Sequence, residues 1–472
     1  MPGEGEVDRF EVAYSAGVAE QMRPPAEPGP RRSSADGGPL GAAAPSEGFA
    51  LAGCVLTPTR GIERGYVVIE GDEIAEVTER RPQSVRVHET KGVIAPGLID
   101  LHGHPEFNVF AAWEPPKQFI NRYAWRDSDL YQALVRDPQN HLLDVLPAWT
   151  QLHYSEVRAL VGGVTAIQGT GGQARSYSEE ALVRNVDKWI FGGQVGRSMI
   201  DLPSGSRGMD DLQSILAGIE AGAVKAFYVH LAEGRSDNQR SRDEFERLVG
   251  LDALTASTVV IHGTALSEDQ LADLADAEAK LVWSPQSNLR LYGETTKAGA
   301  ALARDVTVGL GADWLPSGST SLLAEVKVAR RCLADEGHEV SPKRLVDMLT
   351  RDAAKAAGLA DKLGSLAKGR PADLVVFERR AADPWANVVD AEPASVELVM
   401  IDGDLTYGRA DWISELAASP DESQLEPLIA WGKRMLLDTS HMVNPNGEQA
   451  PTLGQLRTDL VREFPQVGPI FA

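Results

Sequence analysis

Two histidines separated by one residue end a largely apolar segment early in the chain. His102 and His104 follow residues 93–101, which contain mostly aliphatic side chains. In an extended strand, side chains two positions apart point to the same side, so both imidazoles can face one point in space. Imidazole nitrogens that converge in this way are typical metal ligands.

Three further polar residues close predicted strands. His230 ends a strand at 224–230, His262 ends a strand at 258–262, and Asp313 follows a strand at 306–311. Most of these features also have an ordinary structural explanation when taken alone. The His-x-His pair of His102 and His104 could lie on an exposed strand, His262 could be a core histidine, and Asp313 could cap a helix. Their coincidence at four separate strand ends favours one common site.

These strands alternate with predicted helices over residues 95–365. A further strand is expected at 280–284, and the third and fourth strands must lie between 182 and 202. Ser267 and Gln270 form a capping-box pattern for a helix through Ala279, and Ser341 with Pro342 opens a helix that ends at Gly358. This alternation predicts an α/β fold, with a (β/α)8 barrel as the leading architecture. In such barrels the carboxyl ends of the strands carry the active site.

The segments on either side of this region have different patterns. Residues 1–46 are rich in Pro, Gly, Ala and Ser, which predicts a mobile tail. Residues 47–94 and 366–410 contain short β-rich segments and are expected to form one small β-sheet domain, interrupted by the intervening chain. Residues 411–472 are expected to be a helical extension, with helices around 424–437 and 453–463 that cover the barrel or contribute to a dimer interface.

Composition narrows the class of protein. The 472 residues are 43% hydrophobic and 24% charged, which is ordinary for a soluble enzyme. A net charge of −22 argues against a nucleic-acid partner, and no apolar segment approaches the length that spans a membrane. Cys54 and Cys332 are too few for a disulfide framework. We therefore expect a cytoplasmic protein with a small-molecule substrate and no membrane partner.

The donor set indicates the chemistry. Three imidazoles and a carboxylate suit Zn²⁺, with Fe²⁺ and Mn²⁺ as alternatives. Water bound to such an ion has a pKa lowered to about 7, so hydroxide is available near neutrality. Glu233, three residues after His230, could move a proton between that water and a leaving nitrogen.

The chain resembles the amidohydrolase superfamily, on the side that includes the triazine hydrolases, the cytosine and guanine deaminases and imidazolonepropionase. The resemblance covers about residues 49–408 and rests on six motifs: APGLIDLHGH at 95–104, HLAE at 230–233, His262, SPQSNL at 284–289, GLGAD at 309–313 and KGRPADLVVF at 368–377.

The resemblance implies a distorted (β/α)8 TIM barrel beside a small β-sandwich domain. It implies one divalent metal ion, most often zinc, bound by His102, His104, His230 and Asp313. It also implies His262 as a ligand or a hydrogen-bond donor to the substrate oxygen, Glu233 as the proton shuttle, and Asp313 as the base that activates water. Since the superfamily is commonly oligomeric, a homodimer is expected.

Other branches of the superfamily hold two metals bridged by a carboxylated lysine. Lys188 is the one lysine at a suitable distance before His230. The His-x-x-Glu arrangement at 230–233 is typical of the one-metal branch, so Lys188 is expected to be a surface residue.

The loop after His104 departs from the better-known deaminases. Residues 113–126 combine aromatic side chains with arginines, and this stretch could be a lid that stacks a ring and pairs an anionic group, or a loop held on the barrel by its aromatics. Asn288 and Trp314 are also expected to border the pocket. The candidate substrate-binding residues are Trp113, Arg122, Tyr123, Trp125, Arg126, Asn288 and Trp314.

The predicted function is hydrolysis of a non-peptide C–N bond in a small cyclic nitrogen compound by attack of metal-activated water. Deamination and ring opening of a cyclic amide use the same residues and stay open. Two alternatives are loss of halide or alkylamine from a triazine-like ring, and a non-catalytic scaffold that keeps the barrel. The scaffold is disfavoured because such proteins lack the ligands that this chain retains.

Overall fold

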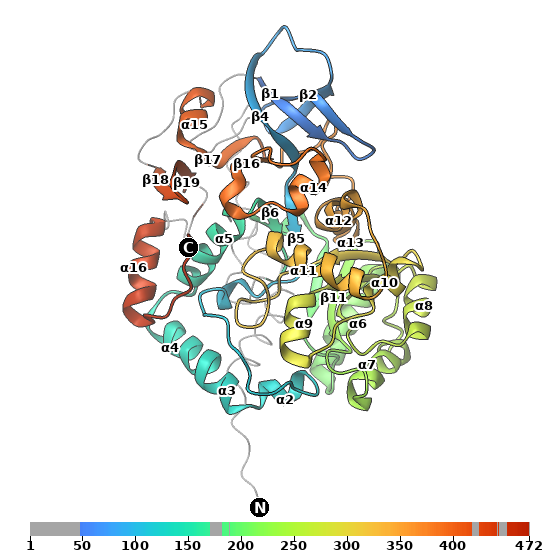
Figure 1. Cartoon of the computed structure of the whole chain (residues 1–472). Helices are drawn as coiled ribbons and strands as arrows, with labels where there is room; N and C mark the ends of the chain where they lie inside the picture. Colours follow the sequence, from blue (N-terminus) through green and yellow to red (C-terminus); the bar gives the residue numbers. More distant parts are fainter. Residues whose placement is uncertain are drawn as a thin grey trace, which may run out of the picture.

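The computed structural model of the chain describes residues 48–169, 182–187, 189–417, 424–440, 442 and 451–471 (Figure 1). The expected tail at 1–46 and Lys188 lie outside these residues. Within the described ranges, no helix is long and apolar enough to cross a membrane.

A nine-stranded mixed sheet combines the two ends of the chain. Its order is β18-β19-β17-β16-β15-β4-β1-β2-β3. Its first four strands precede the region of parallel strands in the sequence. Within the sheet, β4 pairs antiparallel with β15, so that Val93 faces Phe377. The strands are β1 (Phe49–Leu56), β2 (Gly61–Glu70), β3 (Glu73–Thr78), β4 (Arg86–Pro96), β15 (Leu374–Phe377), β16 (Val396–Ile401), β17 (Asp404–Arg409), β18 (Leu425–Ala430) and β19 (Lys433–Asp438). Segments that the sequence predicts as one interrupted sheet thus pair directly, at the top of Figure 1.

The prediction of a helix around 424–437 is wrong. These residues form the hairpin β18–β19, in which Ala430 pairs with Lys433 across Trp431 and Gly432. Both turn residues have positive φ, 48° and 78°, which is the backbone of the tight turns that favour hairpins. Pro427 would also break the interior of a helix. The second expected helix is present as α16 (Leu453–Glu463), which packs on α5 (Ala148–Val161).

Eight parallel strands position the candidate site. Three form the sheet β5-β6-β7 and five form the sheet β10-β11-β12-β13-β14. Their bounds are β5 (Leu98–Asp100), β6 (Val164–Ile167), β7 (Arg184–Asn185), β10 (Gly196–Met199), β11 (Ala226–Leu231), β12 (Thr258–His262), β13 (Lys280–Trp283) and β14 (Thr307–Leu310). The third and fourth strands expected between 182 and 202 are therefore β7 and β10. A separate hairpin pairs β8 (Trp189–Ile190) with β9 (Gly193–Gln194).

Backbone hydrogen bonds join the two parallel sheets on one side. Leu101 N donates to Leu310 O at 3.1 Å, and Asp313 N donates to His102 O at 2.8 Å, so the end of β5 lies beside the end of β14. In the part of the chain that the structure describes, no ladder links β7 with β10. The parallel α/β architecture is thus present, and a fully closed barrel is not assigned.

Helices connect and cover these strands. The capping box of Ser267 and Gln270 is present at α8 (Glu268–Asp276). The single helix expected from Pro342 to Gly358 is divided, because Thr350 has a non-helical backbone (φ −132°, ψ −90°) between α12 (Pro342–Leu349) and α13 (Arg351–Ala356). The other helices are α2 (Arg122–Arg126), α3 (Asp129–Tyr131), α4 (Asp137–Val145), α6 (Ser206–Glu220), α7 (Gln239–Gly250), α9 (Pro285–Tyr292), α10 (Ala298–Leu302), α11 (Leu322–Asp335), α14 (Pro384–Val389) and α15 (Ala410–Leu416), with short turns of other helix types at Pro105–Phe107, Gln132–Arg136 and Pro393–Ser395.

The parallel strands are buried on both faces. Every residue of β11, β12 and β14 is buried, as expected where helices cover a parallel sheet. Since parallel strands all end at the same edge, this packing brings the residues that follow β5, β11, β12 and β14 to one place.

Candidate metal centre

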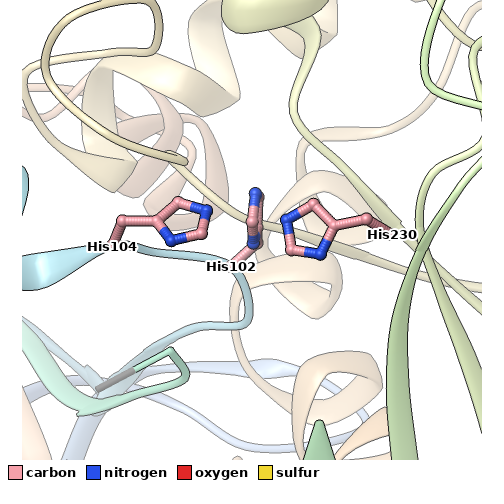
Figure 2. Close-up of side chains that lie close together, drawn as sticks. All are labelled: His102, His104 and His230. Atoms are coloured by element: carbon pink, nitrogen blue, oxygen red, sulfur yellow. The ribbon is translucent and has the colours of Figure 1, made fainter. Parts of the chain in front are cut away.

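Four imidazoles meet at the carboxyl ends of three strands. The ring of His102 lies 5.0 Å from that of His104, 4.8 Å from that of His230 and 4.9 Å from that of His262, measured between centroids. Figure 2 shows the rings of His104 and His230 on either side of the His102 ring. The structure thus brings together the histidines that the sequence assigns to one site.

Asp313 adds a carboxylate to this group. Its Oδ1 lies 3.1 Å from His102 Nε2 and 3.7 Å from His104 Nε2. Ligand atoms of His102, His104 and His230 lie within 4.8 Å of one another, and so do those of His102, His262 and Asp313. Burial opposes ionisation of Asp313, but the imidazole of His102 outweighs it and the pKa of the carboxyl is lowered.

These residues fit a divalent cation. Nδ1 of His102 and Nδ1 of His230 are buried without a hydrogen-bond partner, which costs about 1–3 kcal/mol for an ordinary polar group. Burial lowers the pKa of His104 to about 3 and that of His230 well below its ordinary value. Both rings are therefore neutral, which is the form that binds a metal.

The backbone at three of these strand ends is left-handed. Ala232, His262 and Asp313 have φ values of 51°, 69° and 61°. Such values are uncommon for residues other than glycine and cost about 1–3 kcal/mol each where the structure enforces them. The unusual backbone is therefore concentrated where β11, β12 and β14 meet the candidate centre.

Glu233 lies beside the imidazoles with a fixed orientation. Its Oε2 is 3.7 Å from His262 Nε2, and its Oε1 accepts a hydrogen bond of 2.5 Å from the Tyr292 hydroxyl. Burial raises the pKa of this carboxyl. A carboxyl whose pKa is raised in this way keeps its proton to higher pH than an exposed glutamate does, and it can deliver that proton to a leaving group.

His262 has a defined tautomer. Asn288 Nδ2 lies 3.0 Å from His262 Nδ1, while Asn288 Oδ1 accepts a hydrogen bond from Thr295 at 3.2 Å. An amide nitrogen only donates, so Nδ1 accepts and the ring proton sits on Nε2. This tautomer favours His262 as a hydrogen-bond donor toward the site rather than as a metal ligand.

A cavity of about 650 Å³ opens beside the centre. His104, His230, Glu233, His262 and Asp313 all line it. Of the predicted substrate-binding residues, five also line it: Arg122, Tyr123, Trp125, Arg126 and Trp314.

Trp113 and Asn288 do not line the cavity, contrary to prediction. Trp113 is 3% exposed and packs behind Trp314, with ring centroids 5.8 Å apart. Asn288 is fully buried beneath His262, which it orients. Both residues contact side chains that line the cavity, Trp113 through Trp314 and Asn288 through His262.

The arginine of the predicted lid is held by carboxylates of the protein itself. Arg122 is 2% exposed, and its Nη2 lies 2.8 Å from Asp201 and 3.2 Å from Glu244. Its Nη1 donates to the carbonyl of His230 at 3.2 Å, and its backbone N donates to Glu233 O. Hydrogen bonds therefore hold α2 against the end of β11. Side chains of α2 also line the cavity.

Replacing Arg122 with methionine is expected to destabilise the protein by about 3 kcal/mol, because the buried carboxylate of Glu244 loses its ion pair and keeps only the hydrogen bonds from Tyr123 and Ala232 N. Urea unfolding measures the difference. Arg126→Met is the matched control. This arginine is more exposed, and among the described residues its ion pair is with Asp201, so a loss below about 1 kcal/mol is expected. Equal losses in both variants would contradict a structural role specific to Arg122.

Several residues of the site have no sequence signal of their own. Tyr292 and Glu244 contact Glu233 and Arg122 from α9 and α7, and neither residue lies within one of the six motifs. Asp100 accepts hydrogen bonds from His102 N at 3.3 Å and Ala312 N at 3.1 Å, and burial raises its pKa to about 7. Unlike the other two, Asp100 lies within the motif at 95–104, two residues before His102, and this position was the available signal.

Comparison with known proteins adds independent information. The sequence profile of the amidohydrolase family matches residues 209–406. A 5-methylthioadenosine/S-adenosylhomocysteine deaminase from Teredinibacter turnerae is 31% identical over 326 residues, which cover 62% of this chain and 73% of the relative.

Solved structures show the same fold at lower identity. A zinc-bound adenosine deaminase from Xanthomonas campestris is 16% identical and superimposes with a TM-score of 0.62 over 88% of this chain and 97% of its own. An atrazine chlorohydrolase from Arthrobacter aurescens, complexed with zinc and atraton, is 14% identical, with a TM-score of 0.63 over 88% of this chain and 99% of its own.

Proposed function

This chain belongs to the amidohydrolase family and is a hydrolase of carbon–nitrogen bonds other than peptide bonds, and we propose that it deaminates an adenine-type ring with the help of one divalent metal ion. The observation that carries the proposal is the arrangement of Asp313, Glu233 and His262 around one cavity. Relatives and neighbours named as deaminases of adenine nucleosides support the choice of ring. We also infer that the two parallel sheets form one distorted barrel.

The metal would be held by His102, His104, His230 and Asp313. When bound, a zinc-like ion supplies Lewis acidity that makes a water molecule acidic near neutrality. The three imidazoles, of which those of His104 and His230 are neutral, and the single carboxylate match the preferences of zinc, with iron and manganese as further candidates.

The side chains of the chain account for the proton transfers. Asp313, kept ionised by the neighbouring imidazole, accepts a proton from the attacking water as its oxygen bonds to the ring carbon. Glu233 gives a proton to the adjacent ring nitrogen during the attack, then takes the proton of the new hydroxyl and delivers it to the departing nitrogen. The C–N bond breaks, the ring carbonyl forms and ammonia leaves, and the proton held by Asp313 returns to Glu233. His262 Nε2–H donates to the oxygen on which negative charge develops.

The same groups would also open a cyclic amide or displace a substituent from a triazine, as the atrazine chlorohydrolase neighbour illustrates by name. Deamination releases ammonia, ring opening releases none, and dechlorination releases chloride. The products therefore distinguish the reactions.

We expect the zinc-loaded protein to release one ammonia per molecule of an adenine nucleoside, and to lose at least about 90% of this activity after chelation, with recovery on adding zinc, because every proton transfer occurs at the metal centre. A panel of adenosine, 5-methylthioadenosine, S-adenosylhomocysteine, guanine, atrazine and a cyclic amide, followed by ammonia, chloride and mass analysis, measures this. Full activity in metal-free protein, or turnover of the cyclic amide alone, would contradict the proposal.

A further inference from the structure

Arginines gather on the wall of the cavity although the chain as a whole is strongly acidic. The net charge is −22, with 46 basic and 68 acidic residues. Five arginines nevertheless line this one cavity: Arg122, Arg126, Arg136, Arg240 and Arg247. A local excess of one charge in a cavity raises the concentration of ligands of opposite charge.

Two of these arginines are occupied by internal ion pairs. Arg122 contacts Asp201 and Glu244, and Arg126 contacts Asp201 at 2.9 Å. Their charge is largely balanced within the protein. The capacity to bind an anion must therefore come from the other arginines, and Arg240 and Arg247 are the two that share one helix.

Arg240 and Arg247 have a different environment. Both lie on α7, at the lower right of Figure 1, and the spacing of seven residues places them on the same face two turns apart. The guanidinium of Arg240 lies over the Tyr123 ring, 3.3 Å from its centroid, and Arg247 donates to the carbonyl of Pro203. Neither contact neutralises the charge, and within the described ranges no carboxylate forms an ion pair with either side chain.

The position of α7 connects these arginines with the reaction. The helix follows β11, whose end carries His230 and Glu233, and all four side chains line the same cavity. Arg242, on the same helix, contacts Gln239 instead and does not line the cavity. All three side chains are exposed, but Arg240 and Arg247 line the cavity and Arg242 does not.

We propose that the substrate carries an anionic group, a phosphate or a carboxylate, joined to the reacting ring, and that Arg240 and Arg247 contact this group. The inference rests on the proposed function, because it names the substrate class of that same site. Guanidinium groups suit both oxyanions, since their paired N–H groups match two oxygens of either one.

The test compares charged and neutral substrates in matched variants. Steady-state kinetics with the zinc-loaded protein give kcat/KM for adenosine 5′-monophosphate and S-adenosylhomocysteine, with adenosine and 5-methylthioadenosine as the neutral counterparts. We expect at least one anionic compound to exceed its counterpart by about tenfold or more, from one or two charge-assisted hydrogen bonds. The monophosphate arm identifies a phosphate, and the homocysteine arm identifies a carboxylate.

The variants assign the effect to α7. Arg240→Met and Arg247→Met are each expected to lower the ratio of anionic to neutral kcat/KM by about tenfold, and Arg242→Met is expected to leave that ratio unchanged. A ratio near one in the wild type, or the same ratio in all three variants, would overturn the inference while deamination itself stands.

Binding measurements separate the two proposals. Titration calorimetry of the zinc-loaded protein with adenosine 5′-monophosphate, with adenosine and with inorganic phosphate requires no turnover. Tighter binding of the anionic nucleotide that is lost in Arg247→Met, without ammonia release from any compound, would keep the anion site and reject the deaminase. Equal affinity for the nucleotide and the nucleoside would reject the anion site.

Discussion

Replacing Glu233 with glutamine is expected to lower kcat for deamination by about 10²–10⁴-fold, while zinc content and KM stay close to those of the wild type. Glutamine keeps the size of the side chain and can still contact the Tyr292 hydroxyl, which lies 2.5 Å from Glu233 Oε1. It has no carboxyl proton to give to the leaving nitrogen.

Stopped-time ammonia assays together with metal analysis of the same sample measure both quantities. Glu220→Gln, an exposed position at the end of α6, is the matched control and is expected to retain wild-type rates. A Glu233→Gln enzyme with wild-type kcat would remove Glu233 from the proton transfer.

Asp313→Asn is expected to have a still larger effect, a loss of kcat/KM of at least about 10³-fold, because one side chain serves as a metal ligand and as the acceptor of the water proton. The amide cannot accept that proton, and its neutral oxygen is a weaker ligand than a carboxylate. Zinc retained after dialysis should therefore fall below that of the wild type, in contrast to Glu233→Gln.

The chain offers a close control for the backbone at this position. Asp305 is exposed and also has a positive φ, 59°, compared with 61° at Asp313. Asp305→Asn makes the same chemical change on a similar backbone away from the cavity, so it should retain activity and zinc. Matching losses in both variants would indicate a backbone effect rather than lost chemistry.

The convergence of the candidate metal ligands could be predicted because they lie at the ends of strands. His102, His230 and Asp313 each stand at the end of an apolar segment, and parallel strands bring their carboxyl ends to one edge. The positions of these residues in the sequence and the chemistry of their side chains were therefore sufficient to predict that they come together. The tautomer of His262 was not predictable, since it depends on Asn288, which contacts it from another element.

The arginine-rich loop shows where sequence reasoning ends. Residues 113–126 permitted either a substrate-binding lid or a loop held to the barrel. The structure shows contacts of both kinds, because Arg122 pairs with Asp201 and Glu244 while its neighbours face the cavity. Those two acids lie far away in the sequence, and no local pattern identifies them as partners.

The C-terminal hairpin shows a different limit. Residues 425–430 show no strict alternation, because Leu428 lies between Pro427 and Ile429 and both of these are exposed. The turn at Trp431 and Gly432 adopts positive φ. Apolar residues in a short segment suit a helix as well as a strand, and the pairing of β19 with β17 decides between them.

The pairing of β4 with β15 has a consequence for biosynthesis. Val93 cannot pair with Phe377 until Phe377 has been synthesised and has left the ribosome. At ordinary rates of translation, synthesis of the intervening residues takes on the order of tens of seconds. During that interval one edge of β4 has no partner, and exposed strand edges invite pairing with other chains. A nascent chain that stops before residue 374 would contain His102, His104, His230 and Asp313 but lack the strands that complete the sheet beside them. Yield of active enzyme should therefore depend on how well the cell protects this edge while the chain is being made.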